Sequence, residues 1–268
     1  MKFGIIGTGF IFRKHLQAIY KVGGKIVDVV DSSHGPEAWK EMVKNPEIDS
    51  VVILTPNNLH FGMAKFSAEN KKIVLCEKPL AIKSSEVKIL AKKPNIFTVS
   101  QLRYHPLVKK LRSKIKKDKN YKIEINISVH RDKEYWKSWK GISERSGGIL
   151  FNLGIHYFDL LLYLFGEPVA ISTQSLTDRK GEGVIKGKNY LCNWRISAEA
   201  PKENQNRLFK VNGVNYDFSG SENLHFYVYK DLLEGRGITP KEALNVLKVL
   251  DACQKSMEKG RKIINILG

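Results

Sequence analysis

The side chains best able to do chemistry follow two short apolar runs of the sequence. Thr-Pro-Asn-Asn-Leu-His follows the run at residues 51–54, and Glu77, Lys78 and Pro79 follow the run at residues 73–76. Both runs have the length of buried strands. In an open parallel sheet, ligands bind just beyond the carboxyl ends of the strands, so we expect both segments to line one crevice. Lys78 is the strongest candidate there, because an ammonium can polarise a hydroxyl or, with a depressed pKa, act as a base.

A second group of polar side chains interrupts the most apolar stretch of the chain, residues 149–165. Asn152, His156 and Asp159 are spaced i, i+4 and i+7, which would place them on one face of a helix. Polar groups are costly to bury without partners, so this alignment indicates function, and Asp159 could hold the His156 ring in one tautomer. A purely structural polar network is the alternative. The spacing is not a zinc signature, and no metal site is predicted.

A glycine turn at residues 7–9 follows a predicted strand and opens a predicted helix. Such glycines allow a pyrophosphate to approach backbone N–H groups at the start of the helix. The third glycine of the usual pattern falls at Phe12, so the turn alone is a weak signal. Asp31 ends the next predicted strand, where a carboxylate accepts hydrogen bonds from ribose hydroxyls and repels a 2′-phosphate. This favours NAD over NADP, although Asp31 could instead cap a turn.

The first hundred residues alternate between strand and helix patterns, which is typical of a doubly wound parallel sheet. The predicted strands are residues 2–6, 25–30, 50–54, 72–75 and 96–100, and the predicted helices are residues 11–21, 37–44, 58–70 and 84–92. Only residues 32–50 separate Asp31 from Val51. This is shorter than the length commonly used for a helix, a strand and a helix, so we expect the third strand of the usual sheet to be missing or vestigial.

The pattern changes after Tyr104. Residues 121–129 alternate strictly between apolar and polar, which predicts a half-buried strand of an antiparallel sheet. The apolar segment 149–165 reads as a helix. Further strands are expected at residues 169–175, 189–199, 207–211 and 214–218, with a hairpin turn at 212–213, and a capped helix is expected from Thr239. The sequence therefore predicts a dinucleotide-binding domain at residues 1–102 and an α+β domain with an open, largely antiparallel sheet at 103–268; its role in substrate binding and oligomerisation is implied only by the resemblance described below.

Composition narrows the function classes. The chain has 268 residues, 42% hydrophobic content and a net charge of +18. Its densest basic run, residues 109–119, lacks interleaved aromatics and reads as a helix with a solvated face, so nucleic-acid binding is not favoured. No apolar run was expected to reach the roughly 20 residues of a membrane span. Three scattered cysteines fit a reducing cytoplasm, and no signal peptide is expected.

Together these motifs resemble the glucose–fructose oxidoreductase and inositol dehydrogenase family, and the resemblance covers nearly the whole chain. They are the Gly-x-Gly turn at 7–9, Thr-Pro-Asn-x-x-His at 55–60, Cys-Glu-Lys-Pro at 76–79, Gln-Leu-Arg-Tyr-His-Pro at 101–106 and Gly-x-His-x-x-Asp at 154–159. Within the family, the Tyr-Trp-Lys-Ser-Trp-Lys-Gly segment at 135–141, the Asn at 152 and the segments at 211–213 and 233–237 are similar to bacterial UDP-N-acetylglucosaminuronate 3-dehydrogenases.

The resemblance implies NAD-dependent oxidation of the 3-hydroxyl of a UDP-sugar uronate, on a route to surface polysaccharide. It implies Lys78 and His156 as the catalytic pair and a homotetramer, or a homodimer, built through the sheet of the second domain. The expected cofactor-binding residues are Gly7, Thr8, Gly9, Phe10, Ile11, Asp31, Thr55, Pro56, Asn57, His60, Glu77, Lys78 and Gln101. The expected substrate-binding residues are Lys78, Arg103, His105, Lys137, Lys140, Asn152, His156 and Tyr157.

Several alternatives remain open at this point. The chain could be another sugar or inositol dehydrogenase of the same family, or a non-catalytic NAD-binding regulator. His60 could be a surface residue, and Asn57 or Asn58 could simply cap the following helix. Lys137 and Lys140 could be solvated loop charges that flank Trp side chains of the core.

Overall fold

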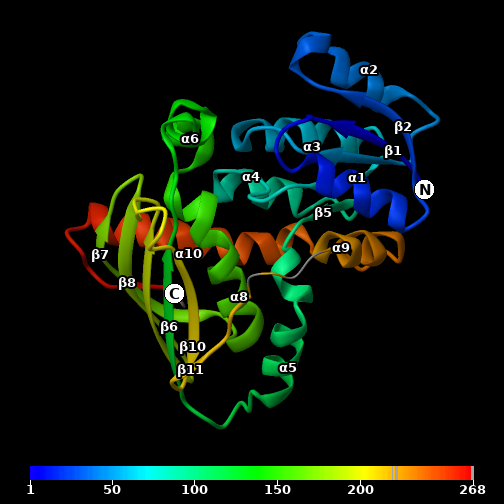
Figure 1. Cartoon of the computed structure of the whole chain (residues 1–268). Coiled ribbons are helices and arrows are strands. Elements are labelled where there is room, and N and C mark those ends of the chain that lie inside the picture. The colour runs from blue at the N-terminus through cyan, green and yellow to red at the C-terminus, as the bar shows by residue number, and fades with distance from the viewer. Residues whose placement is uncertain (219, 221–222, 267–268) are drawn as a thin grey trace. The chain divides into compact units, whose positions relative to one another are not determined.

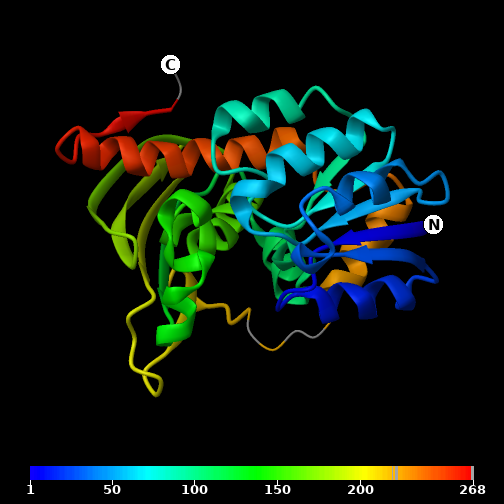
Figure 2. The ribbon, with the colours of Figure 1, turned by 90° about the horizontal axis from the view of Figure 1, so that it is seen from above.

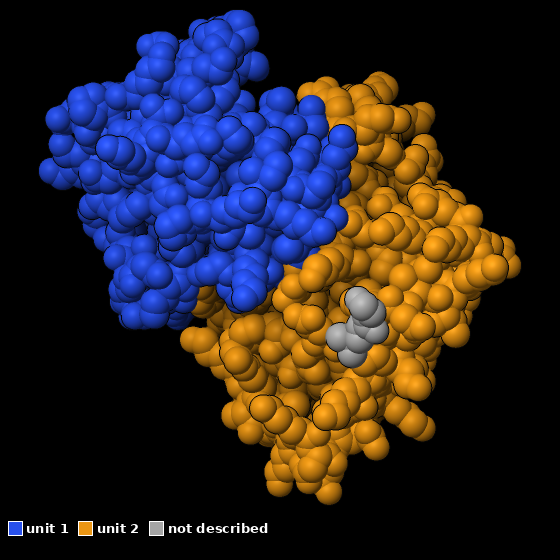
Figure 3. All heavy atoms as spheres, turned by 180° about the vertical axis from the view of Figure 1, so that it is seen from behind, with its two compact units in different colours: residues 1–101, 222–244 blue, residues 102–221, 245–268 orange. Residues whose placement is uncertain are grey.

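The computed structural model describes residues 1–218, 220 and 223–266. The chain divides into two compact units (Figure 3). Unit 1 contains residues 1–101 and 222–244, and unit 2 contains residues 102–221 and 245–268. The first division lies next to the predicted boundary at residue 102. The predicted second domain, however, included residues 222–244, which the structure assigns to unit 1.

Unit 1 is built on a five-stranded parallel sheet with the order β2-β1-β3-β4-β5. Its strands are β1 (Lys2–Ile6), β2 (Lys25–Val30), β3 (Ser50–Ile53), β4 (Ile73–Cys76) and β5 (Ile96–Thr98). The predicted doubly wound sheet is confirmed. The structure describes every residue from 32 to 49, and none of them is in a strand, so β2 is the sheet edge and the expected absence of one strand is confirmed.

Helices cover both faces of this sheet (Figures 1 and 2). The connection from β1 to β2 moves one way along the sheet, and the later connections move the other way. Because crossovers between parallel strands are right-handed, the first helix lies on one face and the later helices lie on the other. The helices are α1 (Phe12–Lys21), α2 (Ala38–Lys44), α3 (His60–Glu69) and α4 (Ser84–Leu90), with short 3₁₀ turns η1 (Ser32–His34) and η2 (Asn57–Leu59).

A helix from late in the sequence completes unit 1. Helix α9 (Leu224–Leu233) packs beside α1, and its Tyr229 ring meets Phe3 edge to face at 5.7 Å. Farther along the chain, Ile238 forms a β-bridge with Thr98. These contacts explain why residues 222–244 belong to the dinucleotide unit, a return that no pattern in the sequence indicated.

Unit 2 contains a seven-stranded sheet with the order β11-β10-β6-β9-β8-β7-β12. Its strands are β6 (Tyr121–Ser128), β7 (Pro168–Leu176), β8 (Lys180–Gly187), β9 (Tyr190–Ser197), β10 (Asn206–Val211), β11 (Val214–Asn215) and β12 (Ile264–Asn265). In the part of the chain that the structure describes, β6 and β9 are the only strands of this sheet that pair in parallel, so the predicted largely antiparallel sheet is confirmed. The hairpin turn is also confirmed, because Asn212 and Gly213 both have positive φ. Strands β8 and β12 were not predicted.

The apolar segment of unit 2 forms η5 (Leu150–Gly154), a π-helical turn, which continues as α8 (Ile155–Phe165). Phe158 of α8 packs edge to face on Trp194 of β9 at 5.4 Å. By length and composition, Ser143–Phe165 could cross a membrane, contrary to our expectation, but 72% of its apolar window is buried in the structure. This burial is typical of the core helix of a globular unit.

The remaining helices of unit 2 are α5 (Pro106–Lys114), α6 (Lys133–Lys137), α7 (Ser143–Ser146) and the 3₁₀ turns η3 (Gln101–Tyr104) and η4 (Trp139–Gly141), of which η3 starts on the last residue of unit 1. Helix α10 (Pro240–Glu258) starts in unit 1 and continues into unit 2. In α5, Val108 and Leu111 are buried and the neighbouring lysines are exposed, which confirms the solvated basic face, although the helix ends at Lys114 and does not continue to residue 119 as predicted. The capping box of α10 is formed, since Thr239 N donates to Glu242 Oε2 at 2.9 Å.

Candidate dinucleotide and catalytic site

The glycine turn has the backbone that a dinucleotide site requires. Gly7 has φ +101°, and a Cβ there would lie 2.9 Å from the carbonyl oxygen of Leu54. A Cβ on Gly9 would meet nothing within 4 Å, so the surface above Gly9 is open to a ligand. Helix α1 begins at Phe12, directly after the turn, with Ile11 as its N-cap. The first N–H groups of α1 therefore border the open surface, where they can bind phosphate.

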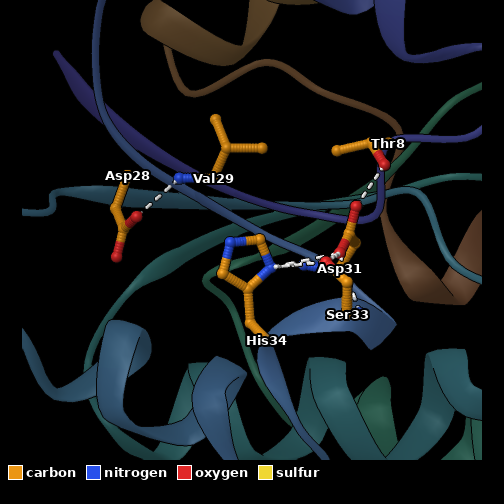
Figure 4. A network of polar contacts seen from close by, with 6 residues as sticks. All are labelled: Thr8, Asp28, Val29, Asp31, Ser33 and His34. Atoms are coloured by element: carbon orange, nitrogen blue, oxygen red, sulfur yellow. Dashed lines mark hydrogen bonds and ion pairs between the residues drawn. The ribbon is translucent and has the colours of Figure 1, made fainter.

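Asp31 is the centre of a polar network at the end of β2 (Figure 4). Thr8 Oγ1 donates to Asp31 Oδ2 at 2.5 Å, and Ser33 donates to Oδ1 through its N–H at 3.0 Å and its hydroxyl at 2.6 Å. His34 Nδ1 lies 3.0 Å from the same oxygen. The hydrogen bonds from Ser33 and Thr8 hold the pKa of Asp31 well below its usual range. Asp31 caps η1, as the alternative interpretation held, and it is also a permanent anion beside the glycine turn.

This placement predicts the cofactor preference. Asp31→Ala is expected to weaken NAD binding at least about tenfold, because hydrogen bonds to a charged group are lost, and to leave NADP binding unchanged or improved, because repulsion of its 2′-phosphate disappears. Isothermal titration calorimetry with both nucleotides measures this. Asp28→Ala is the matched control, since Asp28 lies on the same strand and accepts a hydrogen bond from Val29 N. An unchanged ratio of NAD to NADP affinity in Asp31→Ala would contradict the assignment.

The segment after β3 brings Thr55, Pro56 and Asn57 to the carboxyl end of the sheet. Asn57 is buried, and neither η2 nor α3 has a side-chain cap, so the capping alternative for Asn57 and Asn58 is wrong. His60 is completely buried, so the surface alternative is wrong as well. Its Nδ1 lies 2.6 Å from the carbonyl oxygen of Pro79, and its Nε2 lies 2.8 Å from that of Thr55. His60 therefore connects the segments that follow β3 and β4.

Glu77 precedes Lys78 and belongs to a buried cluster that the sequence did not reveal. Its Oε1 lies 3.0 Å from His15 Nε2 and 3.8 Å from His225 Nε2, and His15 Nδ1 contacts the hydroxyl of Tyr229 at 2.8 Å. Burial raises the pKa of Glu77, but the interactions with His15 and His225, hydrogen bonds first among them, outweigh it and hold that pKa well below its usual range. Glu77 Oε2 also accepts from Lys78 N at 3.2 Å. The carboxylate thus fixes the backbone at Lys78, as we expected.

Gln101 ends unit 1, and its Oε1 is buried without a hydrogen-bond partner among the residues that the structure describes. Buried polar atoms rarely lack a partner. An unsatisfied buried acceptor just after β5, the last strand of the unit 1 sheet, fits a bound dinucleotide. The residues present therefore fit the cofactor.

In unit 2, Arg103 and Asp159 form a buried, bidentate ion pair. Arg103 Nε donates to Asp159 Oδ2 at 2.9 Å, and Nη2 donates to Oδ1 at 2.6 Å. The two side chains are 10% and 5% exposed. Both oxygens of Asp159 are therefore engaged by Arg103, whereas we had expected Asp159 to orient His156 and Arg103 to grip the substrate. These two roles stay predictions.

The π-helical turn changes the geometry of the polar face. Asn152 lies in η5, where i→i+5 hydrogen bonding shifts side chains away from the positions of an α-helix. Its Nδ2 donates to the carbonyl oxygen of Lys140 at 3.1 Å. Asn152 and His156 are partly exposed, and Asp159 is buried. The three residues therefore do not share one role, because Asn152 binds the backbone of residues 135–141, the Trp-rich segment, whereas Asp159 binds Arg103.

The Trp-rich segment carries cations over aromatic rings. The Arg131 guanidinium lies 5.0 Å from the centre of the Tyr135 ring, and Lys140 Nζ lies 5.5 Å from the same ring and 5.9 Å from that of Trp139. Burial, followed by the charge of Arg131, lowers the pKa of Lys140. Lys137 instead pairs on the surface with Glu134, at 71% and 77% exposure, as the solvated interpretation described. Trp139 is partly exposed and is not a core residue.

His105 and Tyr157 have structural contacts in unit 2. His105 Nδ1 accepts from Leu107 N at 3.1 Å, which caps α5, and its ring meets Phe218 at 5.4 Å. Tyr157 is buried, and burial raises its pKa to about 12. Their proposed contacts with substrate stay predictions.

Comparisons with known proteins match both units. Residues 1–95 match the model of an oxidoreductase family with an NAD-binding Rossmann fold, and residues 119–200 match the GFO/IDH/MocA C-terminal domain. The structure is similar to the WlbA (WbpB) dehydrogenase of Thermus thermophilus in complex with NAD and α-ketoglutarate, with a TM-score of 0.87 and 27% identity over 95% of this chain and 94% of that one. The same dehydrogenase in complex with NAD and UDP-GlcNAcA gives a TM-score of 0.83 and 27% identity over 93% of each chain.

Among curated proteins, the chain is 28% identical to 2,7-anhydro-N-acetylneuraminate hydratase of Escherichia coli over 191 residues. This alignment covers 62% of this chain and 50% of that protein. It is also 27% identical to myo-inositol 2-dehydrogenase of Thermotoga maritima over 194 residues. This alignment covers 63% of this chain and 56% of that protein. The chain thus spans about half the length of the curated relatives that it matches. These relatives act on different substrates.

Proposed function

Because the chain belongs to the GFO/IDH/MocA oxidoreductase family, with its NAD-binding Rossmann domain, we propose that it oxidises the 3-hydroxyl of a UDP-N-acetyl sugar uronate, UDP-N-acetylglucosaminuronate, with NAD. One observation carries the proposal. A dehydrogenase 27% identical over 93% of both chains was crystallised with NAD and UDP-GlcNAcA. The Trp-rich segment, whose sequence is similar to the UDP-N-acetylglucosaminuronate 3-dehydrogenases, supports the proposal because it contains a partly buried cation, Lys140.

Two side chains are assigned to the chemical step. NAD, when bound, supplies a hydride acceptor. His156 of unit 2 takes the proton of the 3-hydroxyl as a general base, and Lys78 of unit 1 stabilises the developing alkoxide with its ammonium. The opposite assignment, with Lys78 as the base, uses the same two residues. Glu77 supports either assignment, since its carboxylate accepts from the backbone N–H of Lys78.

Lys140 and Arg131 are proposed to attract the anionic substrate. Burial and the charge of Arg131 both lower the pKa of Lys140, so an anionic substrate beside these two like charges would stabilise the charged form of Lys140. UDP-GlcNAcA and α-ketoglutarate, the ligands crystallised with the similar dehydrogenase, both carry carboxylates. A carboxylate or diphosphate placed here would relieve the repulsion.

Removal of the Lys140 charge tests this role. Lys140→Ala is expected to raise the Michaelis constant for the uronate about tenfold or more, because a charge-assisted contact is lost, and to leave that for NAD unchanged. The wild-type affinity should also decline as pH rises toward the lowered pKa of Lys140, earlier than for a lysine of ordinary pKa. Steady-state kinetics measures both effects. Lys133→Ala, an exposed change in α6, is the control. An equal rise in the Michaelis constants for NAD and for the uronate would show that Lys140 does not bind the substrate.

A second candidate activity is the oxidation of a free cyclitol or another sugar, because the chain is 27% identical to a myo-inositol 2-dehydrogenase along part of its length. The cations of the Trp-rich segment have no evident use with such a neutral substrate. Thermal-shift measurements with nucleotide sugars and inositols, with NAD present, separate the two candidates.

The proposed assembly is a homotetramer, or a homodimer, in the cytoplasm. The outward face of β9 in unit 2 exposes Leu191, Asn193 and Arg195, and it offers a broad surface for a second copy of the chain. Light scattering at several protein concentrations measures the oligomeric state.

A further inference from the structure

His60 begins α3 and is completely buried, and each of its two ring nitrogens faces a main-chain oxygen. The carbonyl oxygen of Pro79 lies 2.6 Å from Nδ1, and that of Thr55 lies 2.8 Å from Nε2. These oxygens belong to the two segments that carry Thr55 after β3 and Lys78 after β4. One side chain therefore bridges the two strand ends at which we place the chemistry.

The two contacts specify the protonation state of the ring. A carbonyl oxygen only accepts hydrogen bonds, and a neutral imidazole has one N–H donor and one lone pair. At 2.6 or 2.8 Å, a lone pair aimed at a carbonyl oxygen is repulsive, so only the imidazolium satisfies both contacts. His15 in the same unit differs, because the Tyr229 hydroxyl beside its Nδ1 can donate while Nε2–H donates to Glu77. His15 is thus satisfied as a neutral ring.

The charges near His60 favour its protonated form in part. Burial is the largest influence and, with the charge of Lys78, holds the pKa of His60 below its usual value, although the hydrogen bonds to Pro79 and Thr55 and the charge of Glu77 raise it. Glu77 is itself a buried anion, since its own pKa is held well below its usual range. A buried cation needs such a partner to avoid a large desolvation penalty.

We propose that His60 is a positioning residue which, as an imidazolium, ties the segment after β3 to the segment after β4 and so sets the position of Lys78. Loss of the ring proton releases one of the two carbonyls and loosens the connection. This inference rests on the proposed role of Lys78 in catalysis. The position of Lys78 should therefore depend on pH. Below the pKa of His60 both hydrogen bonds, to Pro79 and to Thr55, are made, and above it one of them is lost.

Nuclear magnetic resonance of the histidine ring nitrogens tests the protonation without any substrate. In wild-type protein with ¹⁵N-labelled histidine, the His60 signals are identified by their loss in His60→Gln. Both ring nitrogens of His60 are expected to be protonated at the acidic end of the range from about pH 5 to pH 9, with one proton lost at the basic end. His15 is the internal control and is expected to stay neutral, with its proton on Nε2. A His60 ring that stays neutral over the whole range would overturn the proposal.

Kinetics of His60→Gln then tests the positioning. We expect kcat to fall about tenfold or more and the Kd for NAD to change less than about twofold. The kcat of the variant should also lack the pH dependence that wild-type kcat shows over the titration of His60. If Lys78→Ala abolishes turnover but His60→Gln keeps wild-type kcat, the positioning role is wrong and the proposed function stands. If Lys78→Ala keeps wild-type turnover, the proposed function fails, whatever His60 does.

Discussion

Lys78→Ala is expected to reduce turnover about 10²- to 10⁴-fold, the range found when a positioned general acid or base is removed. Lys78 follows the buried strand β4, and its backbone N–H is held by Glu77 at 3.2 Å. NAD binding, measured by calorimetry, should change less than about threefold, because the glycine turn and Asp31 are untouched. The loss should therefore appear in kcat and not in the affinity for the cofactor.

The control for this change is Lys88→Ala, which removes an exposed lysine from α4 in the same unit. Its kcat should equal that of the wild type. If Lys78→Ala retains near-normal kcat, the reaction does not depend on this ammonium. Both proposed assignments of base and alkoxide stabiliser to Lys78 and His156 would then be wrong.

The second large effect concerns the stability of unit 2. Asp159→Ala leaves the Arg103 guanidinium, 10% exposed, without its bidentate partner. Breaking a buried ion pair by removing one partner typically costs about 3–5 kcal/mol, so the free energy of unfolding of this unit should fall by that amount. Urea unfolding followed by tryptophan fluorescence measures it, since Trp136, Trp139 and Trp194 all lie in unit 2.

Two further variants separate the charge from the packing. Asp178→Ala removes an exposed aspartate of the same unit and should change stability by less than about 0.5 kcal/mol. The double variant Arg103→Met with Asp159→Leu removes both charges, and it should recover most of the loss, because an apolar pair of similar volume often replaces a buried ion pair without cost. If the double variant is no more stable than Asp159→Ala, the loss of stability comes from altered packing and not from the unpaired charge.

Most of the fold of both units was predictable because their strands have clear hydrophobic patterns. Strand β3 is buried from end to end, β4 is buried after its first residue, and every second residue of β6 from Ile123 on is buried. The missing strand after Asp31 followed from chain length alone. Strand β8 was missed because Gly181, Gly183 and Gly187 dilute its pattern, although these glycines sit where a Cβ would strike Leu176, the Ser172 carbonyl or the Tyr190 ring.

The contacts that were missed are those between residues distant in the sequence. His15, Glu77, His225 and Tyr229 come together only because α9 returns to pack beside α1. The i, i+4, i+7 spacing of Asn152, His156 and Asp159 predicted one helical face, but the π-helical turn is set by local backbone hydrogen bonding that residue types do not report. The motif residues at strand ends were predictable, whereas the partners that hold them, such as His60 with two carbonyls, required the structure.

The substrate's negative charge is the central claim, and turnover on a matched pair of nucleotide sugars tests it most directly. NADH formation is measured with UDP-N-acetylglucosaminuronate and with neutral UDP-N-acetylglucosamine at equal concentration. The pair differs only in the carboxylate, which the partly buried cation of Lys140 would neutralise. We predict a kcat/KM at least about tenfold higher for the uronate, since one charge-assisted contact contributes about 1.5–3 kcal/mol. Equal kcat/KM values for the two sugars would contradict the account and exclude the uronate as the preferred substrate.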